Sequence, residues 1–270
     1  MKNLIPILLS ACLVISACAN KKEKKTPEEK TVTTTDSIPK ASSVTTKNTI
    51  TDAYFKAHGV EPFWSLTISD KMIKLKTLHN SDSILTPHTE PIYAQDSNVK
   101  LYTLHTELAT VKIEINQMEC INAMSGKSFP YSVTVNYKKG KDKEFTTLEG
   151  CGEYITNYRL HDIWALEELN GTKVSKDDFG KELPYIEINS GKNTFMGTSG
   201  CNRITGKLFS ERERIRFTNI ASTEMLCTKG NEKEQEFIKA LASTISYTIG
   251  NNRLTLLNPD KTLLVFKKVD

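Results

Sequence analysis

The stretch Gly197-Thr198-Ser199-Gly200-Cys201-Asn202-Arg203 decides the fold of the C-terminal half of the chain. Apolar and polar residues alternate on both sides of it, in residues 194–197 and 205–209, and this alternation predicts two strands. The glycines permit turns that other residues avoid, and the Asn202 side chain can hydrogen-bond to nearby backbone groups. The stretch therefore predicts a tight connection between neighbouring strands.

Further strands are expected on either side of this connection. They span residues 163–169, 185–188, 215–219, 254–257 and 262–267. Asn170-Gly171 supplies turn residues that tolerate positive φ, and residues 258–261 form the turn of a final hairpin. These elements predict a predominantly antiparallel sheet.

One helix is expected in this half. Asn231 is predicted as its N-cap, with Glu234 three residues later in a capping-box arrangement. Its apolar stripe is predicted to comprise Phe237, Ile238, Leu241, Ala242 and Ile245. A curved antiparallel sheet packed on one helix is the simplest fold that covers both apolar surfaces.

The motif residues 197–203, followed by Ile220-Ala221-Ser222-Thr223-Glu224-Met225-Leu226-Cys227, resemble the META domain. The resemblance begins near Trp164 and ends at residues 264–266, so the predicted META domain spans residues 160–270. It implies an exported protein of the bacterial envelope, linked to stress and drug tolerance. The family has no established enzymatic chemistry.

The half before it, residues 52–157, also predicts β structure. Strands are expected at residues 54–58, 63–69, 72–78, 99–105, 110–116, 131–137 and 144–148. Glu61-Pro62-Phe63-Trp64, residues 120–126 and Glu149-Gly150-Cys151-Gly152 resemble a second family of uncharacterised exported bacterial domains. That resemblance implies a β-rich exported domain with Cys120 paired to Cys151.

Four cysteines lie in the folded part, Cys120, Cys151, Cys201 and Cys227, and an even number in an exported chain favours disulfides. Three pairings are possible from the residues alone. The sequential one, Cys120 with Cys151 and Cys201 with Cys227, places one bridge in each half. No CxxC motif and no histidine at ligand spacing accompanies them, so we predict no metal site and no cofactor.

The first residues read as a lipoprotein signal peptide. Lys2 precedes an apolar run from Leu4 to Val14, which is too short to span a membrane, and Ile15-Ser16-Ala17-Cys18 resembles a lipobox. We predict cleavage before Cys18 and lipidation, including palmitate, on Cys18; Cys12 is the rival site. Residues 18–51 lack aromatic residues and are rich in Lys, Thr, Ser, Glu and Pro, which predicts a disordered tether.

Candidate binding residues are few. Glu61 and Trp64 could form a site with a hydrogen-bond acceptor and a stacking face, or Phe63 and Trp64 could lie on opposite sides of a strand, with one filling the core. Neither Ser125 nor Ser199 lies in a G-x-S-x-G elbow. The five histidines are scattered, and no catalytic residue is predicted.

The net charge is +4, with basic and acidic residues interleaved, so no nucleic-acid partner is expected. We predict a mainly β (α+β) protein of two domains, attached by its N-terminal lipid to the outer membrane on its periplasmic or surface face. The leading function hypothesis is a non-enzymatic module that binds an envelope protein or small ligand, or maintains envelope integrity under stress. The alternative is an inhibitor of an envelope-directed hydrolase such as lysozyme; a hydrolase is the third hypothesis.

Overall fold

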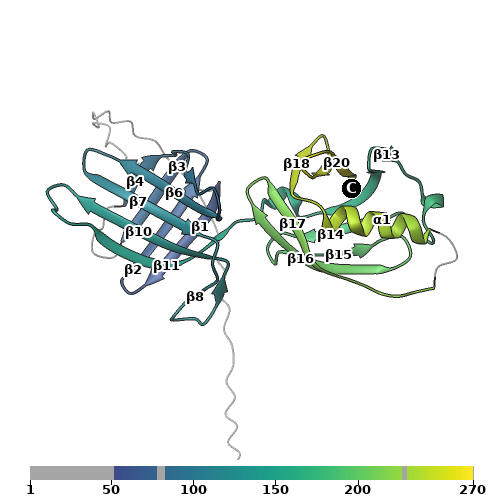
Figure 1. The fold of residues 1–270 in the computed structure, drawn as a ribbon, viewed down its shortest axis with the longest axis horizontal. Helices are drawn as coiled ribbons and strands as arrows, with labels where there is room; N and C mark the ends of the chain where they lie inside the picture. The colour runs from purple at the N-terminus through teal and green to yellow at the C-terminus, as the bar shows by residue number, and fades with distance from the viewer. Residues whose placement is uncertain (1–51, 78–82, 227–229, 270) are drawn as a thin grey trace, which may run out of the picture. The chain divides into compact units, whose positions relative to one another are not determined.

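The computed structural model describes residues 52–77, 83–226 and 230–269. These residues belong to one compact unit and form two nine-stranded antiparallel sheets with separate hydrophobic cores (Figure 1). The predicted signal peptide, Cys18 and the tether of residues 18–51 lie outside the described residues, as do His79 and Cys227. The mainly antiparallel β fold with a single helix is as predicted.

The first sheet has the strand order β4-β3-β2-β1-β11-β10-β7-β6-β5. Its strands are β1 (Ala53–Val60), β2 (Phe63–Ser69), β3 (Met72–Thr77), β4 (Ile84–Pro87), β5 (Ile92–Tyr93), β6 (Val99–His105), β7 (Ala109–Asn116), β10 (Tyr131–Lys139) and β11 (Thr146–Tyr154). Successive residues alternate between buried and accessible along most of these strands, because neighbouring side chains point to opposite faces. The buried face encloses the first core.

A short hairpin of β8 (Cys120–Ile121) and β9 (Ser128–Phe129) joins β7 to β10. The Cys120–Cys151 disulfide ties this hairpin to β11, with a Cα–Cα distance of 5.4 Å. The predicted bridge of the first half is therefore present, and it closes a connection that has little secondary structure of its own.

The second sheet has the order β13-β12-β14-β15-β16-β17-β18-β19-β20, and β20 also pairs with β12. Its strands are β12 (Ile163–Leu169), β13 (Thr172–Lys173), β14 (Tyr185–Asn189), β15 (Thr194–Thr198), β16 (Arg203–Glu211), β17 (Arg214–Ser222), β18 (Ser246–Gly250), β19 (Arg253–Leu257) and β20 (Thr262–Lys268). Two short 3₁₀ helices, Tyr158–Leu160 and Lys176–Asp178, flank β12 and β13. The β12–β20 pairing curls the sheet around the second core.

Helix α1 (Asn231–Ala242) packs on this curled sheet (Figure 1). Phe237 and Leu241 are fully buried, and the Phe237 ring meets Phe266 of β20 edge-on at 6.2 Å. The predicted stripe was wrong at Ala242 and Ile245, which are exposed, because the buried face includes Ala240 and the helix ends before Ile245. The N-cap is Gly230, not Asn231, and the capping box is absent.

Most predicted strands of the two sheets are present, with two informative errors. The strand predicted at residues 144–148 instead runs from Thr146 to Tyr154, because Glu149, Gly150 and Cys151 continue the ladder with β10. Strand β18 was missed, since we extended the helical stripe to Ile245, one residue before the strand begins. The predicted final hairpin is present, with Asn258 N–H donating to the Lys261 carbonyl at 3.1 Å.

Candidate functional site

Trp64 in β2 fills the core of the first sheet. Its side chain is 4% exposed, and its indole N–H donates to the Glu149 carbonyl oxygen at 3.0 Å. Gly59 and Gly150 make room for the ring, since a Cβ built at either would lie within 2.7 Å of a Trp64 atom. The structure leaves no ring face for a ligand, which favours the core interpretation over the stacking site.

Phe63, at the start of β2, and Glu61, just before it, are exposed rather than buried in the core. Phe63 is 47% exposed, Glu61 is exposed, and the Glu61-Pro62 peptide bond is cis. Phe63 and Trp64 therefore point to opposite faces, as the core interpretation requires. The structure does not bring Glu61 and Trp64 together as a binding pair.

The loop after β8 is organised by Asn122, a buried residue. Its Oδ1 accepts hydrogen bonds from the backbone N–H groups of Met124 and Ser125, at 3.1 and 2.9 Å, and from the Ser125 hydroxyl. Its Nδ2 lies 3.1 Å from His58 Nε2 on β1. Ser125 is thus bonded to an amide rather than to a histidine, and this arrangement is structural.

The loop between β15 and β16 is held by Glu234 from helix α1. The Glu234 carboxylate accepts from the Ser199 hydroxyl and from both the backbone N–H and the Nδ2 of Asn202, the last two at 2.9 and 3.0 Å. Burial alone would raise the pKa of Glu234, but these hydrogen bonds outweigh it and hold the pKa below its ordinary value. The Ser199 hydroxyl donates to this carboxylate and, among the described residues, not to a histidine.

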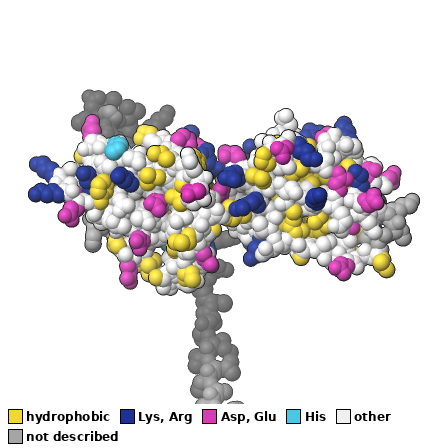
Figure 2. Space-filling view, viewed as in Figure 1, with side chains coloured by type: hydrophobic (Ala, Val, Ile, Leu, Met, Phe, Trp, Pro, Cys, Tyr) yellow, Lys and Arg dark blue, Asp and Glu magenta, His cyan; other side chains and the backbone are white. Residues whose placement is uncertain are grey.

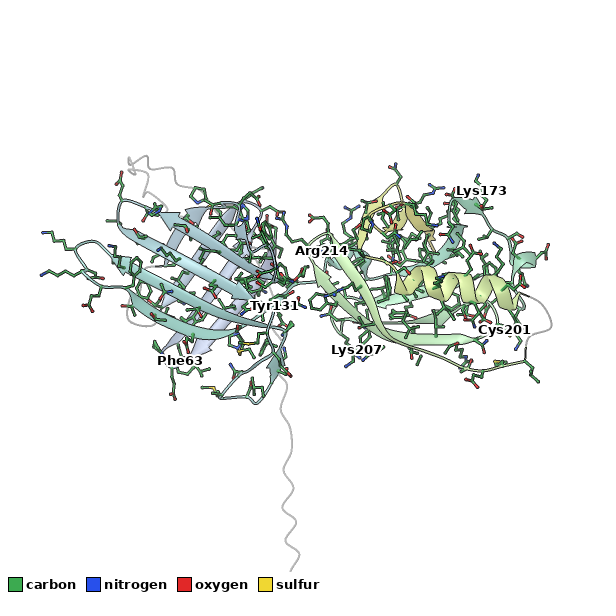
Figure 3. The ribbon with its side chains drawn as sticks, in the orientation of Figure 1. Phe63, Tyr131, Lys173, Cys201, Lys207 and Arg214 are labelled. Atoms are coloured by element: carbon green, nitrogen blue, oxygen red, sulfur yellow. A yellow bond between two sulfur atoms is a disulfide. The ribbon has the colours of Figure 1, made fainter. Side chains whose placement is uncertain are left out.

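Asn202 also holds the segment that leads to α1. Its Oδ1 accepts from the Thr223 hydroxyl at 3.0 Å and from the Met225 N–H at 2.7 Å. Cys201 beside it is disulfide-bonded. Its predicted partner, Cys227, lies outside the described residues, so this pairing stays a prediction (Figure 3).

A second buried carboxylate, Glu211, lies at the tip of the β16–β17 hairpin and contacts the first sheet. Its Oε1 accepts from the Tyr131 hydroxyl on β10, from Asn98 Nδ2 at 2.7 Å and from Lys100 Nζ at 3.4 Å. Glu211, Lys100 and Tyr131 are 6%, 7% and 1% exposed. We call Asn98, Lys100, Tyr131 and Glu211 the carboxylate cluster.

Burial and hydrogen bonds shift the pKa values of Glu211, Lys100 and Tyr131. Burial alone would raise the pKa of Glu211, but the hydrogen bonds from Tyr131 and Asn98 and the charge of Lys100 lower it. Burial lowers the pKa of Lys100, and Glu211 opposes this shift. Burial, and then the hydrogen bond to Glu211, raises the pKa of Tyr131, so its hydroxyl keeps its proton and donates.

The residues beside Glu211 on the hairpin also contact the first sheet. Phe209 packs against the first core, with its ring 6.3 Å from that of Tyr131. The Arg212 guanidinium lies 4.6 Å from the centre of the Tyr54 ring and 2.7 Å from Asp70 Oδ1. Residues 209–212 of the hairpin thus contact the first sheet through an aromatic ring, a carboxylate and a guanidinium.

Two cavities adjoin the carboxylate cluster. One, of about 410 Å³, is lined by Tyr93, Asn98, Glu211 and Arg214 among others. The other, of about 540 Å³, is lined by Tyr131, Tyr154, Lys207 and Phe209 among others. Figure 2 shows basic side chains gathered on this part of the visible face, and Figure 3 places Arg214 and Lys207 there.

The carboxylate cluster was not predicted from the sequence. Ser210-Glu211-Arg212-Glu213-Arg214 reads as an ordinary charged turn, and the donors to Glu211 come from residues 80 to 113 positions earlier. Within the described residues, no group of three or more His, Cys, Asp and Glu could hold a metal. No helix in that part of the chain is long and apolar enough to cross a membrane.

One protein family matches the part of the chain that forms the second sheet. Residues 159–270 match the model of the META domain. No curated protein matches the chain. A protein solved by NMR shares 27% identity, covering 40% of this chain and 90% of that one, with a TM-score of 0.33.

Two further solved structures are similar over part of the chain. A Burkholderia xenovorans protein solved by NMR shares 22% identity over 49% of this chain and 98% of its own, with a TM-score of 0.35. A crystal structure of a DUF4847 family protein from Bacteroides vulgatus shares 20% identity over 41% of this chain and 96% of its own, with a TM-score of 0.30.

Proposed function

Since residues 159–270 form a META domain, we propose that the chain is a non-enzymatic, lipid-anchored envelope protein that binds a partner or maintains envelope integrity. The META domain is not a known enzymatic family. One observation carries the proposal: the polar residues of the META motif are engaged in hydrogen bonds with one another. Ser199, Asn202 and Glu234 hold the loop to helix α1, which suits a scaffold for binding.

The anchor is proposed from the first residues of the sequence. A short apolar run followed by Ile15-Ser16-Ala17-Cys18 is the pattern that lipoprotein maturation requires. Several acyl chains hold a protein at a membrane firmly, whereas a single chain holds it only marginally. The folded part would then act close to the membrane surface.

Substitution of Cys18 tests the anchor. In cells expressing the full chain, Cys18→Ala should move the protein from the membrane fraction to the soluble fraction of the envelope. Cys12→Ala is the matched control, because it removes the rival cysteine, and it should leave the protein in the membrane fraction. A Cys18→Ala protein that stays with the membrane refutes the anchor, and release by Cys12→Ala moves it to the rival site.

Binding is tested with the released protein. Immobilised Cys18→Ala protein should retain one or a few envelope components, and it should leave the rate of peptidoglycan hydrolysis by lysozyme unchanged. Saturable inhibition of lysozyme would replace the proposal with the hydrolase-inhibitor alternative. Hydrolysis of peptidoglycan by the protein itself would overturn the non-enzymatic assignment.

A further inference from the structure

Within the described part of the chain, the donors to the Glu211 side chain belong to the first sheet or to the residues that lead into it. Tyr131 lies on β10, Lys100 on β6 and Asn98 just before β6, whereas Glu211 ends β16 of the second sheet. We infer that these three donors form a carboxylate-binding site of the first sheet, whose resident ligand is Glu211. When the β16–β17 hairpin withdraws, the site accepts the carboxylate of another acidic side chain.

The donor set suits a carboxylate. A hydroxyl, an amide and an ammonium group point at one oxygen, and hydrogen bonds to an ionised acceptor are shorter and stronger than neutral ones. Lys100 Nζ also donates to Asn98 Oδ1, which fixes the amide so that its Nδ2 faces Glu211. The ammonium lies 5.3 and 5.7 Å from the centres of the Tyr154 and Tyr131 rings, so aromatic faces support the cation.

Cations and carboxylates both line the cavities beside the cluster. Arg214 and Arg216 line one cavity together with Asp96, and Lys207 lines the other together with Glu119 and Glu153. Removing one partner of a buried ion pair leaves the other uncompensated, so an empty site has a strong tendency to take up an anion. The two cavities that adjoin the cluster, about 410 and 540 Å³, give a second ligand room to approach.

The resident ligand defines the class of compound that fits. Glu211 presents a carboxylate on a two-carbon aliphatic arm, which matches propionate or the end of an acidic side chain. Phe209 and Arg212 flank it with a ring and a guanidinium, so an acidic segment with a neighbouring aromatic residue should bind more tightly than propionate alone. The site stands whether or not the chain is lipid-anchored.

Rescue of Glu211→Ala by propionate tests the site in the otherwise intact protein. The variant should melt at a lower temperature than the wild type, and propionate should raise its Tm saturably. At a concentration about ten times the dissociation constant, the rise should be about 3 to 6 °C. Propionamide and sodium chloride at equal concentration should not raise it, because neither supplies a carboxylate.

Two comparisons make the outcome decisive. Wild-type protein should not gain stability from propionate, because Glu211 already fills the site, and Glu211→Ala combined with Lys100→Met should lose the rescue. Equal stabilisation of wild type and variant, or of variant and double variant, overturns the proposal as a general salt effect. If Glu211→Ala does not fold, refolding that succeeds in propionate but not in propionamide supports the site, and failure in both contradicts it.

Discussion

Glu234 is a residue whose single charge holds two parts of the META domain together. Glu234→Ala should destabilise the protein by about 3 kcal/mol, because the Ser199 hydroxyl and two donors of Asn202 lose a buried charged acceptor. Glu232→Ala is the matched control on the same helix turn, and its exposed side chain should matter by only about 0.5 kcal/mol. Urea unfolding measures both, and equal losses would contradict this role.

The same carboxylates should make stability depend on pH. Glu211 and Glu234 both have a pKa below the ordinary value of 4.5 in the folded protein. Their contribution is therefore complete above about pH 4.5 and is lost as the pH falls through the lowered pKa values. Between pH 7 and pH 3, the urea midpoint should fall less steeply for Glu234→Gln than for wild type. Parallel curves would show that Glu234 does not contribute to the pH dependence of stability.

Residues that act through distant partners are the ones that the sequence left unpredicted. Asn202 was expected to bond nearby backbone groups, but its side chain accepts from the N–H of Met225, 23 positions away, and its contacts with Glu234 join positions 32 residues apart. Nothing local to Glu211 distinguishes it from Glu213, which is exposed. Tyr131 and Lys100 come together because β10 and β6 both pair with β7, so the carboxylate cluster follows from tertiary structure alone.

At the scale of elements, the β8–β9 hairpin depends on its disulfide. The Cys120→Ala, Cys151→Ala double variant should lose about 3 to 4 kcal/mol, since the bridge closes a loop with a sequence separation of 31. Hydrogen exchange should accelerate most in residues 118–129, which the bridge ties to β11. Unchanged exchange there, with a loss of stability elsewhere, would show that the hairpin is held by its other contacts.

Strands with a long run of alternating apolar and polar residues were predictable. Short strands, and a strand close to the end of a helix, were not. Strands β2, β6 and β12 have the predicted bounds, because seven residues of alternation specify a buried face. Strand β18 was missed although Asn251 and Asn252, both at positive φ, form the turn to β19. Ile245 continues the apolar spacing of helix α1, so the predicted helix ran to this residue. Periodicity alone therefore placed the end of α1 too late.

At the scale of the whole molecule, the β16–β17 hairpin couples the two sheets. The chain should unfold in one transition, and Glu211→Ala with Arg212→Ala should split it by roughly 5 °C, since the buried carboxylate and the Asp70 ion pair are both removed. Each sheet contains one of the two tryptophans, Trp64 in the first core and Trp164 in the second. Single-tryptophan variants, Trp164→Phe and Trp64→Phe, therefore report the unfolding of each sheet separately by fluorescence.

The control for this coupling is Arg214→Ala, which removes an exposed cation from the same hairpin without touching Glu211 or Arg212. In that background the two tryptophan signals should still coincide. If they also coincide in the Glu211→Ala, Arg212→Ala protein, Phe209 and the chain connection suffice to couple the sheets. If they are already separate in the wild type, the sheets unfold independently, and the hairpin contacts contribute little free energy to the folded state.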